Sequence, residues 1–182
     1  MTAETADPGN TGLFNERFAK NLIPLPGFTV PQVGEMAPDF RLPRVQGESV
    51  KLSDYFGQKP VLLAFTRIFT EKLFCPFCYP HIQELKDRYR EIQEAGAELL
   101  MISSTDPVQS AQVVEDLALP YPFLYDPACT TFRRYGAGQA LGAPLPAQYV
   151  LDKTGRIVYR HLFSFADHNV ETSDVLAILR KL

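Results

Sequence analysis

Two short apolar runs with an amphipathic stretch between them constrain the fold of this 182-residue chain most strongly. Residues 60–66 and 97–103 are strongly apolar and too short for core helices, so they predict strands that are buried on both faces. Between them, apolar residues recur every three or four positions, which predicts a helix over 79–95. A strand, a helix and a second strand in this order predict a β-α-β unit.

The rest of the chain continues this alternation and ends with a hairpin and a helix. After the β-α-β unit, the pattern predicts a helix over 107–117, a strand over 123–125, a helical stub over 130–135, strands over 148–151 and 156–163, and a helix over 174–182. Alternating units followed by a hairpin predict an α/β domain, with a mixed central sheet and helices on both faces. We assign this three-layer domain to residues 33–182.

Residues 1–32 differ from the domain in composition and are interpreted as an N-terminal arm. Several prolines and glycines give this segment turn chemistry. Between them, Leu13, Phe14, Phe18 and Leu22 are spaced to line one side of a short helix. Three interpretations stay open: an arm that lies over the domain, an arm that contacts a partner or a second copy in a homodimer, and disorder.

The charge balance argues against several classes of partner. Lys and Arg number 18 against 21 Asp and Glu, a formal net charge of −3, which argues against nucleic-acid binding and a cationic membrane surface. No apolar run approaches the ~18 residues that a membrane-spanning helix needs. The N-terminus lacks the basic and apolar regions of a signal peptide, so we expect a cytoplasmic protein. In a reducing cytosol, its three cysteines are reduced, catalytic, metal-binding or inert.

The segment Cys75-Pro76-Phe77-Cys78 carries the clearest chemical signal, because it lies between a predicted buried strand and a predicted helix. Thiols in a C-x-x-C motif at a helix start have lowered pKa values and exchange readily with disulfides. We therefore predict a redox pair in which Cys75 is the nucleophile and Cys78 resolves the mixed disulfide. If Pro80 instead makes the helix begin near Tyr79, Cys78 lies closest to the helix dipole and becomes the better nucleophile.

Other interpretations of these cysteines and their neighbours stay open. A structural zinc site or an incidental pair of buried cysteines would also fit, but no second ligand pair is present, and we predict neither a metal nor a cofactor. His81 is a candidate proton acceptor or cationic stabiliser, or simply a solvated helix residue. Cys129 is interpreted as a buried structural thiol, with a third redox partner as the alternative. Arg67, Glu71 and Lys72 are candidate modulators, or a solvated loop.

Three stretches of the chain resemble a known family. Residues 33–40 (VGEMAPDF), 50–55 (VKLSDY) and 146–155 (PAQYVLDKTG) are similar to segments of the peroxiredoxin-like branch of the thioredoxin superfamily, the alkyl hydroperoxide reductase and thiol-specific antioxidant proteins. The resemblance implies a thioredoxin-like fold. It also implies that Pro146 forms a cis peptide bond and shapes the surface on which a substrate cysteine docks.

The departures from the peroxiredoxin pattern decide between the functions. In the P-x-x-x-T-x-x-C motif of that family, Thr70 would be the threonine that contacts peroxide, yet Thr66 replaces the proline and Cys75 lies two residues too far along. We therefore predict an enzyme that is a thiol-disulfide oxidoreductase in cell redox homeostasis, acting on protein or small-molecule disulfides. The alternatives are a thiol peroxidase that reduces hydrogen peroxide or organic hydroperoxides, and a redox-sensing module without enzymatic activity.

Overall fold

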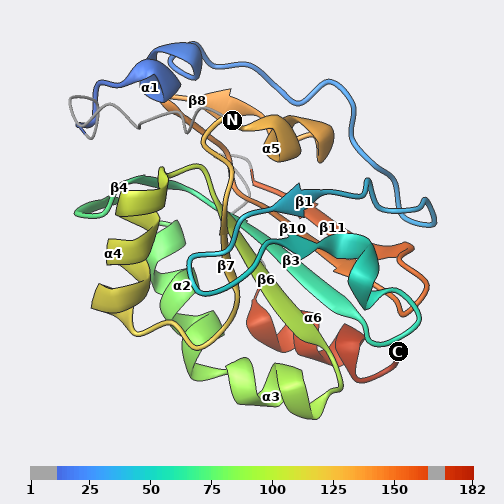
Figure 1. Ribbon diagram of the computed structural model, residues 1–182. Coiled ribbons are helices and arrows are strands. Elements are labelled where there is room, and N and C mark those ends of the chain that lie inside the picture. Colours follow the sequence, from blue (N-terminus) through green and yellow to red (C-terminus); the bar gives the residue numbers. More distant parts are fainter. Residues whose placement is uncertain (1–11, 164–170) are drawn as a thin grey trace, which may run out of the picture.

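The computed structural model describes residues 12–163 and 171–182, and its centre is a five-stranded sheet (Figure 1). In spatial order, the strands are β11 (Ile157–Leu162), β10 (Ala147–Leu151), β3 (Val61–Thr66), β6 (Glu98–Ser103) and β7 (Phe123–Tyr125). The pairs β3–β6 and β6–β7 are parallel, whereas β10 is antiparallel to both of its neighbours. The predicted mixed sheet is therefore confirmed.

The two central parallel strands follow directly from the apolar runs. Every residue of β3 is buried, and all but the first residue of β6 are buried. Side chains alternate between the two faces of a strand, so a run that is apolar throughout needs a cover on both faces. The runs predicted as strands over 60–66 and 97–103 are the two central strands.

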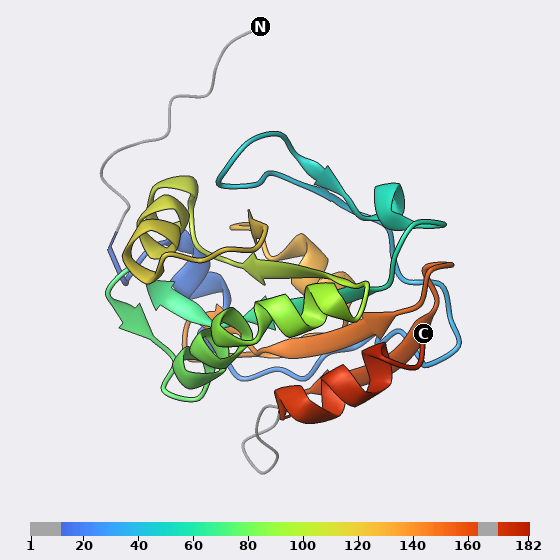
Figure 2. The same ribbon diagram turned by 90° about the horizontal axis from the view of Figure 1, so that it is seen from below.

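Helices cover one face of the sheet, as the view from below shows (Figure 2). They are α2 (Cys78–Asp87), α3 (Tyr89–Glu94), α4 (Pro107–Leu117) and α6 (Thr172–Leu179). The single helix predicted over 79–95 is two helices, because Arg88 leaves the helical conformation at φ −101° and ψ 8°. The apolar side chains of both helices still pack on the sheet, since Ile82, Leu85 and Ile92 are buried in one core cluster.

The opposite face is covered by shorter elements. They are β1 (Arg41–Leu42), β2 (Val50–Lys51), the 3-10 helix η1 (Leu52–Tyr55) and α5 (Thr130–Arg134). The core on this side is aromatic: the ring of Phe65 in β3 lies 5.1 Å from that of Phe132 and 4.9 Å from that of Tyr135. Both faces carry a helix, so the three-layer α/β expectation holds.

The described part of the N-terminal segment, residues 12–32, lies along the domain. It contains α1 (Glu16–Lys20), and Leu25 exchanges two backbone hydrogen bonds of 2.9 and 2.8 Å with Gln139. The short helix was predicted, but its predicted apolar side is not the buried one: Phe14 is 81% exposed, while Arg17 is buried. No helix among the described residues is long and apolar enough to cross a membrane.

The outer edge of β7 is already occupied by main chain. The amide of Val45 donates to the carbonyl of Phe123 at 3.0 Å, and the amide of Tyr125 donates to the carbonyl of Pro43 at 3.2 Å. The segment that connects β1 to β2 therefore begins as a partial sixth strand beside β7, with Arg44 opposite Leu124.

Candidate redox site

The paired cysteines lie at the end of the connection between β3 and α2. Between them and β3, the chain forms a small hairpin, β4 (Ile68–Thr70) and β5 (Leu73–Phe74), which brings Cys75 back to Arg67: the Cys75 amide donates to the Arg67 carbonyl at 3.4 Å. Cys75 is 3% exposed and Cys78 is 2% exposed, and both thiols are free. The sequence pattern did not predict this hairpin, whose strands are only three and two residues long.

The start of α2 fixes the relation between the two thiols. Cys78 is the first residue of α2, and the carbonyl of Cys75 accepts hydrogen bonds of 3.0 Å from the amides of Cys78 and Tyr79. Pro80 lies in the first helical turn, where a missing N–H removes no helical hydrogen bond. Cys78 thus lies at the N-terminus of α2, the position that would make it the alternative nucleophile. The pKa values of the two thiols therefore decide which of them is the nucleophile.

The electrostatics favour the thiolate of Cys75. A hydrogen bond from the Cys78 thiol, the backbone amides of Phe77 and Cys78 and the charge of Arg67 together lower the pKa of Cys75 to about 6, against the opposing effect of burial. The same thiol–thiol hydrogen bond, together with burial, raises the pKa of Cys78 above its ordinary value. At neutral pH, Cys75 is therefore the thiolate and Cys78 the thiol that donates to it.

Arg67 is buried beside the pair, and the expectation that it belongs to a solvated loop is wrong. It is 4% exposed, its Nη2 donates to the carbonyl of Ala140, and its guanidinium lies 4.7 Å from the centre of the Phe69 ring. Burial lowers the pKa of Arg67, while the negative charge available on Cys75 and Cys78 raises it. A guanidinium in this position stabilises a neighbouring thiolate by direct charge attraction.

The hydroxyl of Thr70 is hydrogen-bonded within the β4–β5 hairpin. Its Oγ1 accepts hydrogen bonds from the backbone amides of Lys72 at 3.3 Å and Leu73 at 3.1 Å, which closes the turn between β4 and β5. No described contact joins Thr70 to Cys75. Glu71 and Lys72 form the turn between β4 and β5, as the solvated-loop interpretation of these two residues predicts.

His81 lies one helical turn after Cys78 and points toward the sheet. Its ring hydrogen-bonds the side-chain amide of Gln148 in β10, and its Nδ1 lies 3.9 Å from a carboxylate oxygen of Glu84. Burial lowers the pKa of His81 to about 4, so the ring is neutral at neutral pH. The expectation of a cationic stabiliser at His81 is therefore wrong, whereas a neutral proton acceptor is compatible with this pKa.

Pro146 is buried directly before β10, near the cysteine loop. Its carbonyl accepts a hydrogen bond of 3.1 Å from the amide of Phe163, whose ring centre lies 5.7 Å from that of Phe77 between the two cysteines. The described residues contain no cis peptide bond, so the expected cis bond before Pro146 is corrected to trans.

Cys129 makes no described contact with Cys75 or Cys78. It is buried and has a left-handed backbone at φ 56°, and its Sγ lies 3.7 Å from both Nδ2 of Asn21 and the carbonyl of Pro127. Burial raises the pKa of the Cys129 thiol, which suits a structural thiol. Within residues 12–163 and 171–182, no group of three or more His, Cys, Asp or Glu side chains could hold a metal ion.

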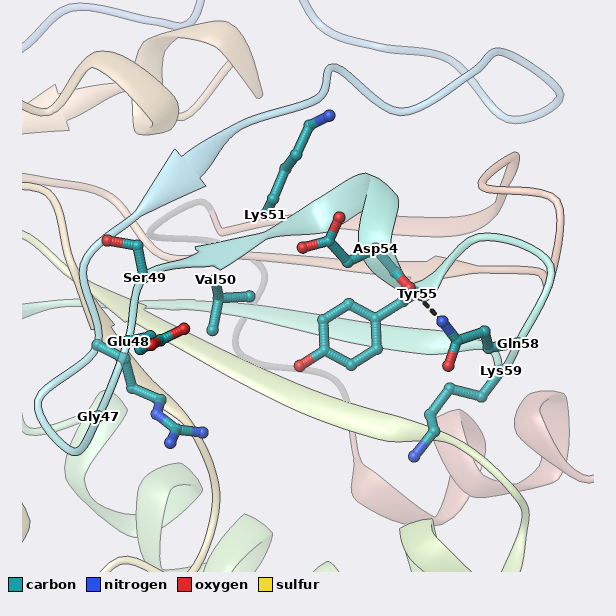
Figure 3. Close-up of a pocket in the computed structure, with 10 residues that line it drawn as sticks. Gly47, Glu48, Ser49, Val50, Lys51, Asp54, Tyr55, Gln58 and Lys59 are labelled. Carbon is teal, nitrogen blue, oxygen red and sulfur yellow. Dashed lines mark hydrogen bonds between the residues drawn. The ribbon is translucent and has the colours of Figure 1, made fainter.

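An open cleft of about 600 Å³ lies on the far side of the domain, between η1 and the segment that leads into β2 (Figure 3). Its charged lining mixes both signs and contains no cysteine: Arg44, Glu48, Lys51, Asp54 and Lys59. Lys51 and Lys59 point in opposite directions in this view, so the cations do not converge on one point. The cleft is therefore separate from the cysteine pair.

The unequal pKa values predict a pH profile for alkylation of the reduced protein. Only a thiolate reacts, so the rate at Cys75 should rise through about pH 6 and level off by about pH 7.5, while Cys78 stays unmodified. Iodoacetamide labelling followed by peptide mass spectrometry gives the rate at each cysteine. Equal labelling of both cysteines near pH 8.5, the range of an ordinary thiol, would contradict the assignment.

A thioredoxin-like sheet with a C-x-x-C pair at the start of a helix defines the class of cysteine-based oxidoreductases. The family model described as "AhpC/TSA family" matches residues 33–160. The chain belongs to this family, the peroxiredoxin-like branch of the thioredoxin superfamily. The resemblance stated from the sequence is thereby confirmed.

Individual relatives agree with this assignment. The chain is 32% identical to peroxiredoxin Q of Suaeda salsa over 150 residues, 80% of this chain and 68% of the relative. It is 32% identical to peroxiredoxin Q of Gentiana triflora over 143 residues, 76% of this chain but only 64% of the relative. Solved structures show that the fold is shared: peroxidoxin BcpB of Mycobacterium tuberculosis superimposes with a TM-score of 0.70 at 24% identity, covering 84% of this chain and 98% of that one. AhpC of Enterococcus faecalis gives 0.71 at 18% identity, covering 84% and 92%.

Proposed function

We propose that this protein is a thiol peroxidase of the peroxiredoxin type, with a small hydroperoxide as oxidant and an external thiol as reductant. The observation that carries the proposal is the Cys75 thiolate, which combines a lowered pKa with a side chain only 3% exposed. A hydroperoxide is far smaller than a protein disulfide, so the low exposure of this sulfur favours the hydroperoxide as the oxidant. The peroxiredoxin Q relatives support the same choice.

In the proposed reaction, the Cys75 thiolate attacks the terminal oxygen of the hydroperoxide. The S–O bond forms as the O–O bond breaks, the departing alkoxide takes a proton to become an alcohol or water, and Cys75 becomes a sulfenic acid. The sulfur of Cys78 then attacks the sulfenic sulfur while its proton passes to the departing hydroxyl, so that a disulfide forms and water leaves. An external dithiol reduces this disulfide and restores both thiols.

Three groups have separate proposed roles in the first step. The Cys78 thiol and the amides of Phe77 and Cys78 donate to the Cys75 sulfur, and Arg67 holds positive charge next to it. Together they keep the nucleophile ionised at neutral pH. The pKa of Cys78 is raised, so it stays protonated until Cys75 has been oxidised.

Thiol-disulfide exchange is the second candidate function, and the position of Thr70 favours it. A peroxidase of the family pattern would use this threonine to contact peroxide, but here its hydroxyl closes the β4–β5 turn. In exchange, Cys75 would attack a substrate disulfide, and Cys78 would release the reduced substrate by attacking the mixed disulfide. Pro146 is buried beside the cysteine loop, so it would support the docking surface without forming part of it.

One experiment separates the candidates. The reduced protein is given hydrogen peroxide or insulin, each with dithiothreitol in the same buffer, and peroxide loss or insulin precipitation is followed. We expect rapid peroxide consumption and little acceleration of insulin reduction over dithiothreitol alone. The opposite result would replace the proposal with disulfide exchange, and inertness toward both substrates would favour the redox-sensing module.

A further inference from the structure

The N-terminal segment places a buried arginine close to the redox site. Arg17 extends from α1 into the domain and is 9% exposed. Its Nη1 donates to the carbonyl of Ile68 at 2.9 Å and to Oγ of Ser104 at 2.8 Å, and its Nη2 donates to the carbonyl of Phe69. Burying a charged group is costly unless hydrogen bonds compensate, so these contacts hold the side chain in one position.

The acceptors of Arg17 lie next to the arginine of the redox site. Ile68 and Phe69 follow Arg67 directly, and the Phe69 ring is the one on which the Arg67 guanidinium lies. Ser104 follows the last residue of β6, so Arg17 ties the main chain of β4 to the end of the central sheet. Arg17 of the N-terminal segment therefore holds the backbone of the two residues that follow Arg67.

The same segment also supports the acceptor of the Arg67 side chain. Ala140 belongs to the short strand β8 (Gln139–Ala140), which pairs with β9 (Ala143–Pro144) and lies next to α1 in Figure 1. Its neighbours in the chain are bound to the N-terminal segment by backbone hydrogen bonds: Gln139 to Leu25, Leu141 to Leu22 at 3.1 Å, and Gly142 to Asn21 at 3.0 Å. Arg67 is thus held at both its backbone and its guanidinium.

We propose that Arg17 is a positioning residue of the redox site, which fixes the Arg67 guanidinium against the Cys75 sulfur through the backbone of β4. The inference rests on the proposed function in one respect, that Cys75 is the nucleophile. It gives residues 12–32 a role in the chemistry, in addition to covering the domain. Arg17 makes no described contact with either paired cysteine, so its effect must pass through Arg67.

A double-mutant cycle tests this dependence. The Cys75 pKa is measured from the pH dependence of iodoacetamide labelling, followed by mass spectrometry, in wild type, Arg17→Gln, Arg67→Gln and the double variant. We expect Arg17→Gln to raise the Cys75 pKa by about one unit, which lowers labelling at pH 6 about fivefold. In the Arg67→Gln background, the same change should have no further effect.

Matched variants separate positioning from general damage to the fold. Lys20→Gln removes an exposed cation from the same helix and should leave the Cys75 pKa unchanged. Ser104→Ala removes one acceptor of Arg17 and should shift the pKa in the same direction but less, which keeps the test decisive if Arg17→Gln fails to fold. An unchanged Cys75 pKa in a folded Arg17→Gln or Ser104→Ala variant, or additive effects in the cycle, would overturn the inference. A wild-type Cys75 with an ordinary pKa would instead refute the proposed function.

Discussion

Replacing Cys75 by serine should abolish peroxide consumption. The hydroxyl of serine stays protonated at neutral pH, so it cannot supply the nucleophile that the Cys78 thiol, the amides and Arg67 stabilise as a thiolate. Loss of a catalytic nucleophile lowers turnover by a factor of about a thousand or more, so we expect only the background rate of peroxide loss. The measurement is peroxide consumption with dithiothreitol, on protein whose thermal unfolding matches that of wild type.

The Cys78→Ser variant is the matched control, because it changes the neighbouring thiol by the same single atom. It should still reduce one equivalent of peroxide per chain and stop at the Cys75 sulfenic acid, which dimedone traps. Full peroxidase activity in Cys75→Ser, or dimedone labelling at Cys78 in that variant, would reverse the roles that we assign.

Replacing Arg67 by glutamine should have the second largest effect. Glutamine retains a donor but no charge, and loss of an opposite charge near a thiolate raises its pKa by about one to three units. From a starting pKa of about 6, this lowers the rate of peroxide reduction at pH 6 by a factor of about five or more. Because the thiolate is the reactive form, raising the pH should restore the rate. The pH–rate profile of single-turnover oxidation measures the shift.

Arg67→Lys separates charge from geometry at this position. Lysine retains the charge but cannot match the planar guanidinium that donates to Ala140 and stacks on Phe69. We expect a Cys75 pKa between those of wild type and Arg67→Gln. An Arg67→Gln protein that keeps the wild-type pH profile would show that the hydrogen bonds from the Cys78 thiol and from the amides at the start of α2 suffice to stabilise the thiolate.

Most of the central sheet could be predicted because its signals are local. The apolar runs that become β3 and β6 need no knowledge of distant residues, and the turn at residues 152–155 predicted the β10–β11 hairpin. The hairpin of β4 and β5 was missed because its strands are too short to show a period. The break at Arg88 was missed because the apolar spacing continues across it.

The cysteine pair could be predicted from its spacing, but its electrostatic partners could not. Arg67 looks like a loop residue in the sequence, since its acceptor, the carbonyl of Ala140, lies 73 positions away in the chain. Arg17 sits among apolar residues that predicted the opposite orientation of its helix, and its burial depends on carbonyls more than 50 positions away. Such long-range polar contacts leave no periodic trace, so only the folded chain brings these groups together.

The segment hydrogen-bonded along β7 limits how copies of this protein can associate. An unpaired edge strand invites a second chain to extend the sheet, which is a common route to aggregation. The amide of Tyr125 and the carbonyl of Phe123 are already bound to Pro43 and Val45 of the same chain. A second copy therefore cannot pair directly with β7 unless this segment first separates from it.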